Sequence, residues 1–248
     1  MALSTPTTLT SNSNGSGATS RTTGSFTPTA NAVLFAAFHA NGSGTPTAPT
    51  FSDSAGLTWT GLFDIGFNST DRVTVKWAEV GGSPASMTVT ADYSGFSTNQ
   101  GSWGVVELTG HTPGAPVVSG STATGSGTST TPATSAVPAL ASAANVQLLW
   151  IASRSNASTP EASSSWLELF DRVGGTNCHL SCYWVGTPGD TSPSAVLAGS
   201  ALWRAMAAEV ESGGLSLAPS GSQLTVQDGS PTYASAFNAF RGLVLRWP

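Results

Sequence analysis

The residues of this chain that could take part in catalysis or metal binding are few and widely spaced. They include three histidines, His39, His111 and His179, and two cysteines, Cys178 and Cys182. No pair of them has the H-x-x-x-H or C-x-x-C spacing of a zinc site. A Ser/His/Asp triad can assemble from distant residues. In a chain with so many serines, however, the presence of the three residue types is no evidence for a triad. His179 alternates with the apolar residues of its strand and is expected to face solvent. These residues predict no metal site and no enzyme.

Motifs that bind phosphate groups or activate a serine are also absent. The chain contains no G-x-x-x-x-G-K-[ST] loop, no G-x-G-x-x-G loop and no G-x-S-x-G elbow, so no cofactor is expected. Glycosidases need two carboxylates close together, and Asp64, Asp171, Glu107 and Glu209 recur as pairs within the repeat described below. Duplicated carboxylates are predicted to accept hydrogen bonds at turns or strand ends. The stretch FSDSAG predicts an Asx turn in which Asp53 caps its own backbone.

The composition excludes several classes of partner. Charged residues make up 8% of the 248 residues, and the formal net charge is -5. An ordinary globular domain has about 25% charged residues. The chain offers no basic surface for a phosphate backbone, so nucleic-acid binding is not expected. Its apolar runs, AVLFAAF and VQLLWIA, are too short to cross a bilayer, and MALSTPTTLT does not resemble a signal peptide. We therefore expect a soluble protein that is made in a cytoplasm and does not bind membranes.

Short runs of Val, Leu, Phe, Trp and Thr alternate with Gly, Pro, Asn and Ser along most of the chain. This pattern is typical of strands joined by turns. The run RVTVKWAEV places Val73, Val75 and Trp77 on one face of a strand. On a strand, Cys178 and Cys182 would lie about 13 Å apart, too far for a disulfide, so two free thiols are expected. Convincing helices are almost absent, and the chain is predicted to be all-β.

An internal repeat supports the all-β prediction. WTGLFD returns as WLELFD 107 residues later, and NAVLFAAF aligns with NVQLLWIA at an offset of 114. Offsets that change only at loops are expected of a duplicated structural unit. In this alignment Cys182 takes the core position of Val75. The repeat predicts a structural core with matching aromatic side chains in both copies: Trp59, Phe63, Trp77, Trp166, Phe170 and Trp184.

Strand number and spacing predict two tandem β-sandwich repeats of jelly-roll or immunoglobulin-like type, which could also be fused into one larger jelly roll. The predicted parts are an extended N-terminal arm at 1–24, a first repeat at 25–114, a second repeat at 115–212, and a C-terminal strand with an apolar tail at 213–248. The tail carries three candidate contacts with a partner or with the domain itself: Phe237, Phe240 and Trp247.

The first half resembles a loose class of phage-encoded virion proteins, with related segments in secreted bacterial β-sandwich proteins. The stretches that carry the resemblance are TFSDSAGLTWT, VTVKWAEVGGSPASMTVTADYSG and SWGVVELTG. The matching residues are Asp53, Trp59, Trp77, Gly81, Gly82 and Gly110. The resemblance covers roughly residues 20–110, and the second copy lacks the Ser-Asp-Ser segment. It implies a β-sandwich on a particle or cell surface and brings no catalytic residue.

The expected function is that of a non-enzymatic structural protein of a tailed phage, assembled in the host cytoplasm and located in the virion. Capsid decoration is the first reading, with docking through the terminal arms on a major capsid or tail protein. A homo-oligomer is expected because particle lattices repeat symmetric copies. The alternative is a tail- or fibre-associated adhesion module that binds a receptor or a host-surface glycan through exposed tryptophans. A hydrolase has no supporting motif.

Overall fold

A computed structural model describes residues 3–15, 17–44, 47–93, 98–154, 161–162, 166–175, 177–187 and 189–213. All regular structure in these ranges is β-strand, so the all-β prediction is confirmed. Residues Met1–Leu215 form one compact unit. The predicted C-terminal strand and apolar tail lie outside the described residues from position 214 onward.

The first half of the chain forms one large and one small antiparallel sheet. The large sheet has the order β1-β8-β3-β6-β5, and the small sheet has the order β2-β7-β4. The large sheet consists of β1 (Thr7–Asn14), β8 (Thr98–Thr109), β3 (Ala32–Gly42), β6 (Asp71–Glu79) and β5 (Thr60–Phe67). The small sheet consists of β2 (Ser20–Thr22), β7 (Val89–Asp92) and β4 (Thr50–Asp53).

The second half builds a sheet of the same kind. Its large sheet consists of β9 (Val117–Ser129), β15 (Ala201–Val210), β10 (Val146–Ser153), β13 (His179–Val185) and β12 (Leu167–Val173), in that order. Its small layer contains β11 (Glu161–Ala162) and β14 (Ala195–Val196). Residues 130–137 run beside β14 and exchange backbone hydrogen bonds with residues 191–197.

The two large sheets therefore have equivalent strand orders. Both also carry a β-bulge at the same point, between Gly61 and Phe63 on β5 and between Glu168 and Phe170 on β12. A bulge is a local feature that does not follow from the hydrophobic pattern alone. The matching order and bulge agree with the repeat seen in the sequence. Descent of the two halves from one duplicated unit stays a prediction.

The strand register corrects one part of the repeat alignment. Phe35 pairs with Trp77 on the neighbouring strand, and Leu148 pairs with Trp184. Because Trp77 and Trp184 correspond, Phe35 corresponds to Leu148, and the offset between β3 and β10 is 113 instead of 114. Side chains alternate between the two faces of a strand, so a shift of one residue exchanges the faces. The offset of 114 would have matched core residues with residues of the opposite face.

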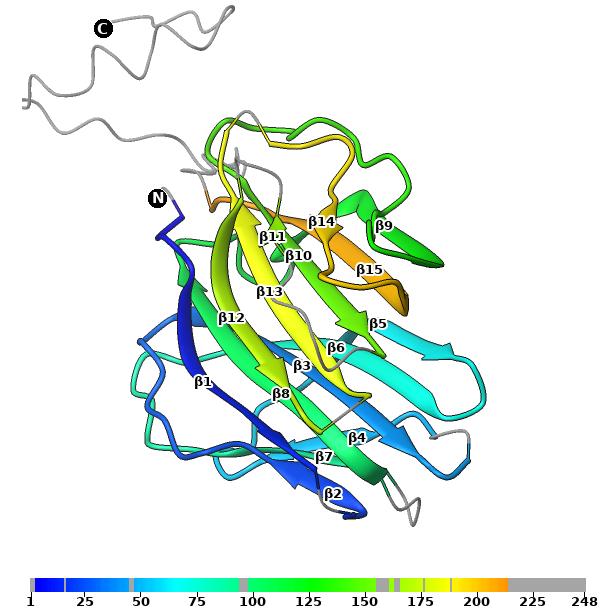
Figure 1. Cartoon of the computed structure of the whole chain (residues 1–248). Helices are drawn as coiled ribbons and strands as arrows, with labels where there is room; N and C mark the ends of the chain where they lie inside the picture. Colours follow the sequence, from blue (N-terminus) through cyan, green and yellow to red (C-terminus); the bar gives the residue numbers. More distant parts are fainter. Residues whose placement is uncertain are drawn as a thin grey trace, which may run out of the picture. The chain divides into compact units, whose positions relative to one another are not determined.

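The two large sheets pack face to face and share one hydrophobic core (Figure 1). This core joins Val33, Phe35 and Val75 of the first half to Leu148 and Trp150 of the second. Each large sheet is covered on its other face by the small layer of its own half, which gives each half a second cluster of buried residues. Every residue of β3 and β10 is consequently buried. Burial on both faces explains why these two strands read as continuous apolar runs.

The large sheets approach each other closely where Gly104 of β8 faces Phe170 of β12. A Cβ atom on Gly104 would lie 2.5 Å from the Phe170 ring, so only glycine leaves room for that ring. At the corresponding place in the other pair of strands, Phe63 of β5 and Met206 of β15 both belong to the shared core. The two halves therefore fill equivalent positions with different pairs of side chains.

The segment predicted as an extended arm, 1–24, contains two strands that pair with strands of its own chain. β1 pairs with β8 at the edge of the large sheet, and β2 pairs with β7 in the small sheet. The hydroxyl of Thr8 on β1 also donates to the carbonyl of Leu169 on β12 at 2.8 Å. In this structure, residues 7–14 and 20–22 are thus part of the folded unit.

Candidate functional site

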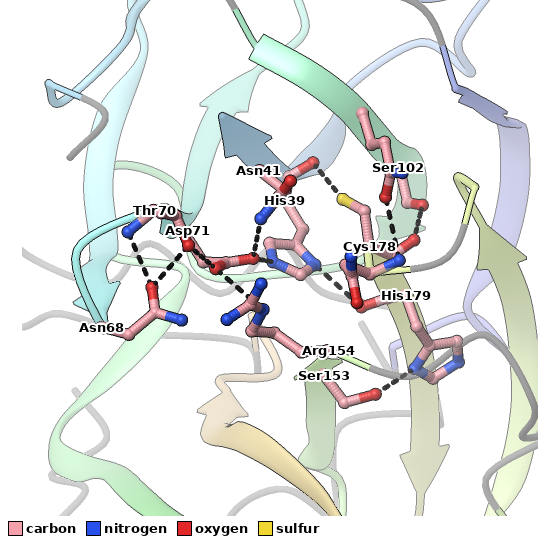
Figure 2. Close-up of polar contacts among 12 residues, drawn as sticks. His39, Asn41, Asn68, Thr70, Asp71, Ser102, Ser153, Arg154, Cys178 and His179 are labelled. Carbon is pink, nitrogen blue, oxygen red and sulfur yellow. Dashed lines mark hydrogen bonds and ion pairs between the residues drawn. The ribbon is translucent and has the colours of Figure 1, made fainter. Parts of the chain in front are cut away.

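Buried polar side chains gather near the ends of β3 and β10, partly between the two large sheets and partly on the outer face of the second one (Figure 2). His39 and Asn41 lie at the end of β3, and Asp71 opens β6. Ser153 ends β10, and His179 opens β13. These five residues are all less than 9% exposed. The cluster therefore gathers polar groups from both halves in a region that is otherwise apolar.

Asp71 is the centre of one half of the cluster. Its carboxylate accepts hydrogen bonds from Asn41 Nδ2 at 3.1 Å and from Thr70 Oγ1 at 2.7 Å. His39 Nε2 lies 3.4 Å from Oδ1, and Arg154 Nε of the second half lies 3.3 Å from Oδ2. Burial alone raises the pKa of a carboxyl, but His39, Thr70 and Asn41 outweigh it and hold the pKa of Asp71 below its ordinary value. Asp71 is therefore a buried anion that links the two halves through Arg154.

The contacts of His39 favour a charged imidazolium. Its Nδ1 lies 3.0 Å from the backbone oxygen of His179, which can only accept a hydrogen bond. Its Nε2 lies 3.4 Å from the Asp71 carboxylate, whose negative charge favours a proton on that nitrogen. Burial opposes this charge, but Cys178 and Asp71 outweigh it and raise the pKa of His39 to about 10. The ring also packs on Phe67, with 4.9 Å between centroids.

Cys178 connects β13 to the first half. Its Sγ contacts the backbone oxygen of His39 at 3.2 Å, and its own backbone oxygen accepts a hydrogen bond from Ser102 Oγ at 2.7 Å. Cys178 and Cys182 are both free and buried, which confirms the prediction of two free thiols. Cys182 lies in the shared core together with Val75, as the repeat predicted, and burial raises the pKa of its thiol.

Ser153, His179 and Asp171 form a hydrogen-bonded chain of the three residue types found in hydrolase triads. His179 Nδ1 lies 3.1 Å from Ser153 Oγ, and its Nε2 lies 2.6 Å from Asp171 Oδ1. The expectation that His179 faces solvent was wrong, since its exposure is 0%. Alternation along the strand placed it correctly on the face opposite Leu180 and Cys182, but that face is covered by the small layer of its own half. Ser153 is equally buried, so its hydroxyl offers no surface to a substrate in this arrangement.

The first half holds an ion pair at the position of Asp171 and His179. At the offset of 107 these residues correspond to Asp64 and Arg72. Arg72 Nε and Nη2 donate to the two carboxylate oxygens of Asp64 at 2.7 and 2.6 Å. A carboxylate bonded to a donor on the adjacent strand thus recurs in both halves. This recurrence supports a structural role for the Asp171–His179 pair.

The other duplicated carboxylates accept hydrogen bonds from loops, as predicted. Glu107 accepts from the backbone N–H of Thr29 at 2.8 Å and from its hydroxyl at 2.9 Å. Glu209 accepts from the backbone N–H of Ala141 and from Asn145 Nδ2, both at 2.7 Å. Each glutamate therefore fixes the loop that leads into the central strand of its own half.

The six predicted core aromatics differ in how deeply they are buried. Those that are less than 9% exposed are Phe63, Phe170 and Trp166, while those that only border the clusters are Trp59, Trp77 and Trp184. Trp59 and Trp166 both donate the indole N–H to an aspartate, Asp53 at 2.8 Å and Asp190 at 3.0 Å. Asp53 also accepts from the backbone N–H of Ala55 at 2.7 Å, which confirms the predicted Asx turn.

The remaining predictions about sites concern metals, membranes and the tail. Within the described ranges, no group of three His, Cys, Asp or Glu side chains could hold a metal ion. The same ranges contain no helix long and apolar enough to span a membrane. The candidate partner contacts Phe237, Phe240 and Trp247 lie outside the described residues.

Sequence reasoning missed the buried cluster because His39 and His179 are 140 positions apart. One signal could have found it, since both histidines stand on strands whose other residues are almost all apolar. A polar residue on a strand that is buried on both faces requires a buried partner. Comparison with models of protein families, with curated proteins and with solved structures gives no match to this chain.

Proposed function

We propose that this chain is a non-enzymatic structural protein of a tailed phage particle, with capsid decoration as its role. The observation that carries the proposal is the use made of the reactive side chains. His39, Asp71 and Cys178 are buried and make polar contacts across the two halves, while Ser153 and His179 are buried and bonded to each other. The contacts across the halves hold the two large sheets together, as expected of a protein whose work is mechanical. The resemblance of the first half to phage virion proteins points the same way.

The mode of attachment in this proposal differs from the arm suggested by the sequence. Strands β1 and β2 of the predicted arm pair with β8 and β7 and therefore belong to the folded unit. Four strands, β1, β5, β9 and β12, stand at the edges of the large sheets in the described part of the chain. An edge strand can receive a strand from a neighbouring protein through main-chain hydrogen bonds. We place the contacts with a capsid or tail protein, and between copies in a homo-oligomer, at such edges.

The test uses phage particles from which the gene for this chain has been deleted. Purified full-length protein is added, free protein is removed by sedimentation, and genome release on heating is followed with a DNA-binding dye. We expect the protein to sediment with the particles at a fixed stoichiometry and to raise the temperature of genome release. Particles that neither bind the protein nor differ in heat stability would contradict the proposal.

The alternative function, adhesion through a tail or fibre, is favoured by one specific observation. Phe51 and Trp59 lie next to each other and are only partly buried, with 5.8 Å between ring centroids. Adjacent aromatic rings at a surface are suited to stacking against a ligand. Deletion of the gene would then abolish attachment to host cells and leave the heat stability of the particles unchanged.

A further inference from the structure

The surface around Phe51 and Trp59 has more features of a ligand site than the two rings. β4 is the edge of the small sheet, and it lies against the large sheet near β6. Lys76 of β6 reaches up to β4 and places its Nζ 4.8 Å from the centre of the Phe51 ring. The indole of Trp59 is held by its hydrogen bond to Asp53. Two partly exposed rings and one ammonium group therefore lie side by side where β4, the edge of the small sheet, meets β6 of the large sheet. We call this place the step between the sheets.

Polar groups continue from this step along β5 and β6. Asp64 accepts hydrogen bonds from Arg72 and from Thr74 Oγ1, the latter at 2.9 Å. Burial raises the pKa of Asp64, but the hydrogen bonds from Arg72 and Thr74 outweigh it, and the nearby charge of Lys76 adds to the lowering. Gly61 pairs with Lys76 on the adjacent strand, and a Cβ atom on Gly61 would meet nothing within 4 Å. The surface beside Lys76 is thus open, with carboxylate, guanidinium and ammonium groups along one side.

The chemistry of this surface fits a sugar. A pyranose ring has apolar C–H faces that stack on aromatic rings and an equator of hydroxyls that bond to charged side chains. The four charged side chains here, Asp53, Asp64, Arg72 and Lys76, carry two negative and two positive charges. Such a balanced set favours an uncharged ligand over an acidic or a basic one.

The second half does not repeat this surface. At the offset of 107, Lys76 and Trp59 correspond to Tyr183 and Trp166, which are 1% and 6% exposed. Arg72 corresponds to His179, which is fully buried. Although the strand order is the same, these corresponding residues of the second half are buried where those of the first half are partly exposed. Because the same fold buries the corresponding residues of the second half, the fold alone does not explain why Phe51 and Trp59 are partly exposed.

We propose that the ledge formed by Phe51, Trp59, Asp64, Arg72 and Lys76 binds a neutral hexopyranose unit of a polysaccharide. The sugar face stacks on Trp59 beside the Phe51 ring that Lys76 covers, and its hydroxyls bond to Lys76 and Asp64. This inference goes beyond the structural role in a particle, and it can fail or succeed independently of capsid binding.

The experiment exploits the fact that Lys76 is the only lysine of the chain. Reductive methylation with ¹³C-formaldehyde gives one side-chain signal in the NMR spectrum, besides that of the terminal amine. The full-length protein is titrated with neutral oligosaccharides derived from dextran, mannan and galactan, and with an acidic oligosaccharide from alginate. We expect at least one neutral oligosaccharide to shift the Lys76 signal in a saturable manner, and alginate to leave it unchanged.

Three variants locate the site on the unmethylated protein by calorimetry. Lys76→Met keeps the apolar stem over Phe51 and removes the donor, and Trp59→Phe reduces the stacking surface. Trp184→Phe is the matched control, because it makes the same change at a partly buried tryptophan of the second half. We expect the first two to weaken binding about tenfold or more, which corresponds to about 1.4 kcal/mol, and the control to bind as the wild type does.

Three results would overturn the proposal. Failure of every neutral oligosaccharide to shift the Lys76 signal would remove the site. If Trp184→Phe weakened sugar binding as much as Trp59→Phe does, the sugar would bind elsewhere or both variants would have lost structure. Circular dichroism of the two variants distinguishes these cases. Preferential binding of alginate would refute the neutral ligand class.

Discussion

Replacing His39 by glutamine tests whether the buried imidazolium stabilises the contact between the two halves. The pKa of His39 is raised from 6.5 to about 10 in the folded protein. A base whose pKa is raised by folding contributes stability that is complete below the unfolded pKa. This contribution is lost as the pH rises through the folded pKa. The His39 contribution is therefore complete below about pH 6.5 and disappears as the pH approaches about 10.

The size of this effect follows from the two pKa values. One pH unit corresponds to about 1.4 kcal/mol for a single proton. Between pH 6.5 and about 10, the free energy of unfolding of the wild type should fall by roughly 5 kcal/mol through His39 alone. The His39→Gln variant has no proton to lose in this range. At pH 6.5 it should be less stable by several kcal/mol, because Asp71 is left buried with fewer charged partners.

The measurement is urea-induced unfolding followed by tryptophan fluorescence at a series of pH values between about 6 and 10. Urea is preferred because guanidinium chloride screens charges. We expect the stability difference between wild type and His39→Gln to shrink steadily as the pH rises. His111→Gln is the matched control, since His111 contacts Glu79 outside the cluster. A Cys178→Ser background removes the neighbouring thiol, which is one cause of the raised pKa of His39. Parallel loss of stability in wild type and His39→Gln across the range would refute the reasoning.

Three further predictions follow from the packing. Gly104→Ala should lower the free energy of unfolding by about 1 to 3 kcal/mol, because the new methyl group overlaps a ring of the facing sheet. The control Gly61→Ala, with open space around its Cβ, should change the free energy of unfolding by less than about 0.5 kcal/mol. Equal changes for the two variants in urea unfolding would contradict the close contact at Gly104. Deletion of residues 1–24 removes β1 and β2 and should lower the unfolding temperature, whereas a calorimetric trace equal to that of the full chain would mean that these strands do not stabilise the unit. Cys178 and Cys182 should react with Ellman's reagent only after unfolding, and rapid reaction of the native protein would show that the shared core opens.

The sequence was sufficient for the class of fold and for several local features. Alternation in RVTVKWAEV identified the face of β6 that carries Val73 and Val75, and both residues lie in the shared core. The Asx turn at Asp53 followed from local chemistry, because an aspartate side chain can bond to the backbone two residues on. These predictions depend on neighbours in the chain, and so they do not require knowledge of the tertiary contacts.

The features that the sequence did not reveal depend on what covers each face. His179 was expected to face solvent because alternation separates two faces but does not say whether water or protein lies beyond the second. The partners of Asp71 come from β3 and from the residue after β10, and no spacing rule connects them. The offset of 114 failed for a related reason, since apolar residues occupy both faces of β3 and β10 and leave no alternation to fix the alignment.

The burial of β3 and β10 on both faces has a consequence for how this protein can change over evolutionary time. A substitution on the outer layers is accommodated by one neighbour or by water. A substitution on either central strand meets a packed layer whichever face its side chain points to. Among future relatives of this chain, the two central strands should therefore diverge most slowly, while the small sheets and their loops are free to acquire new surfaces.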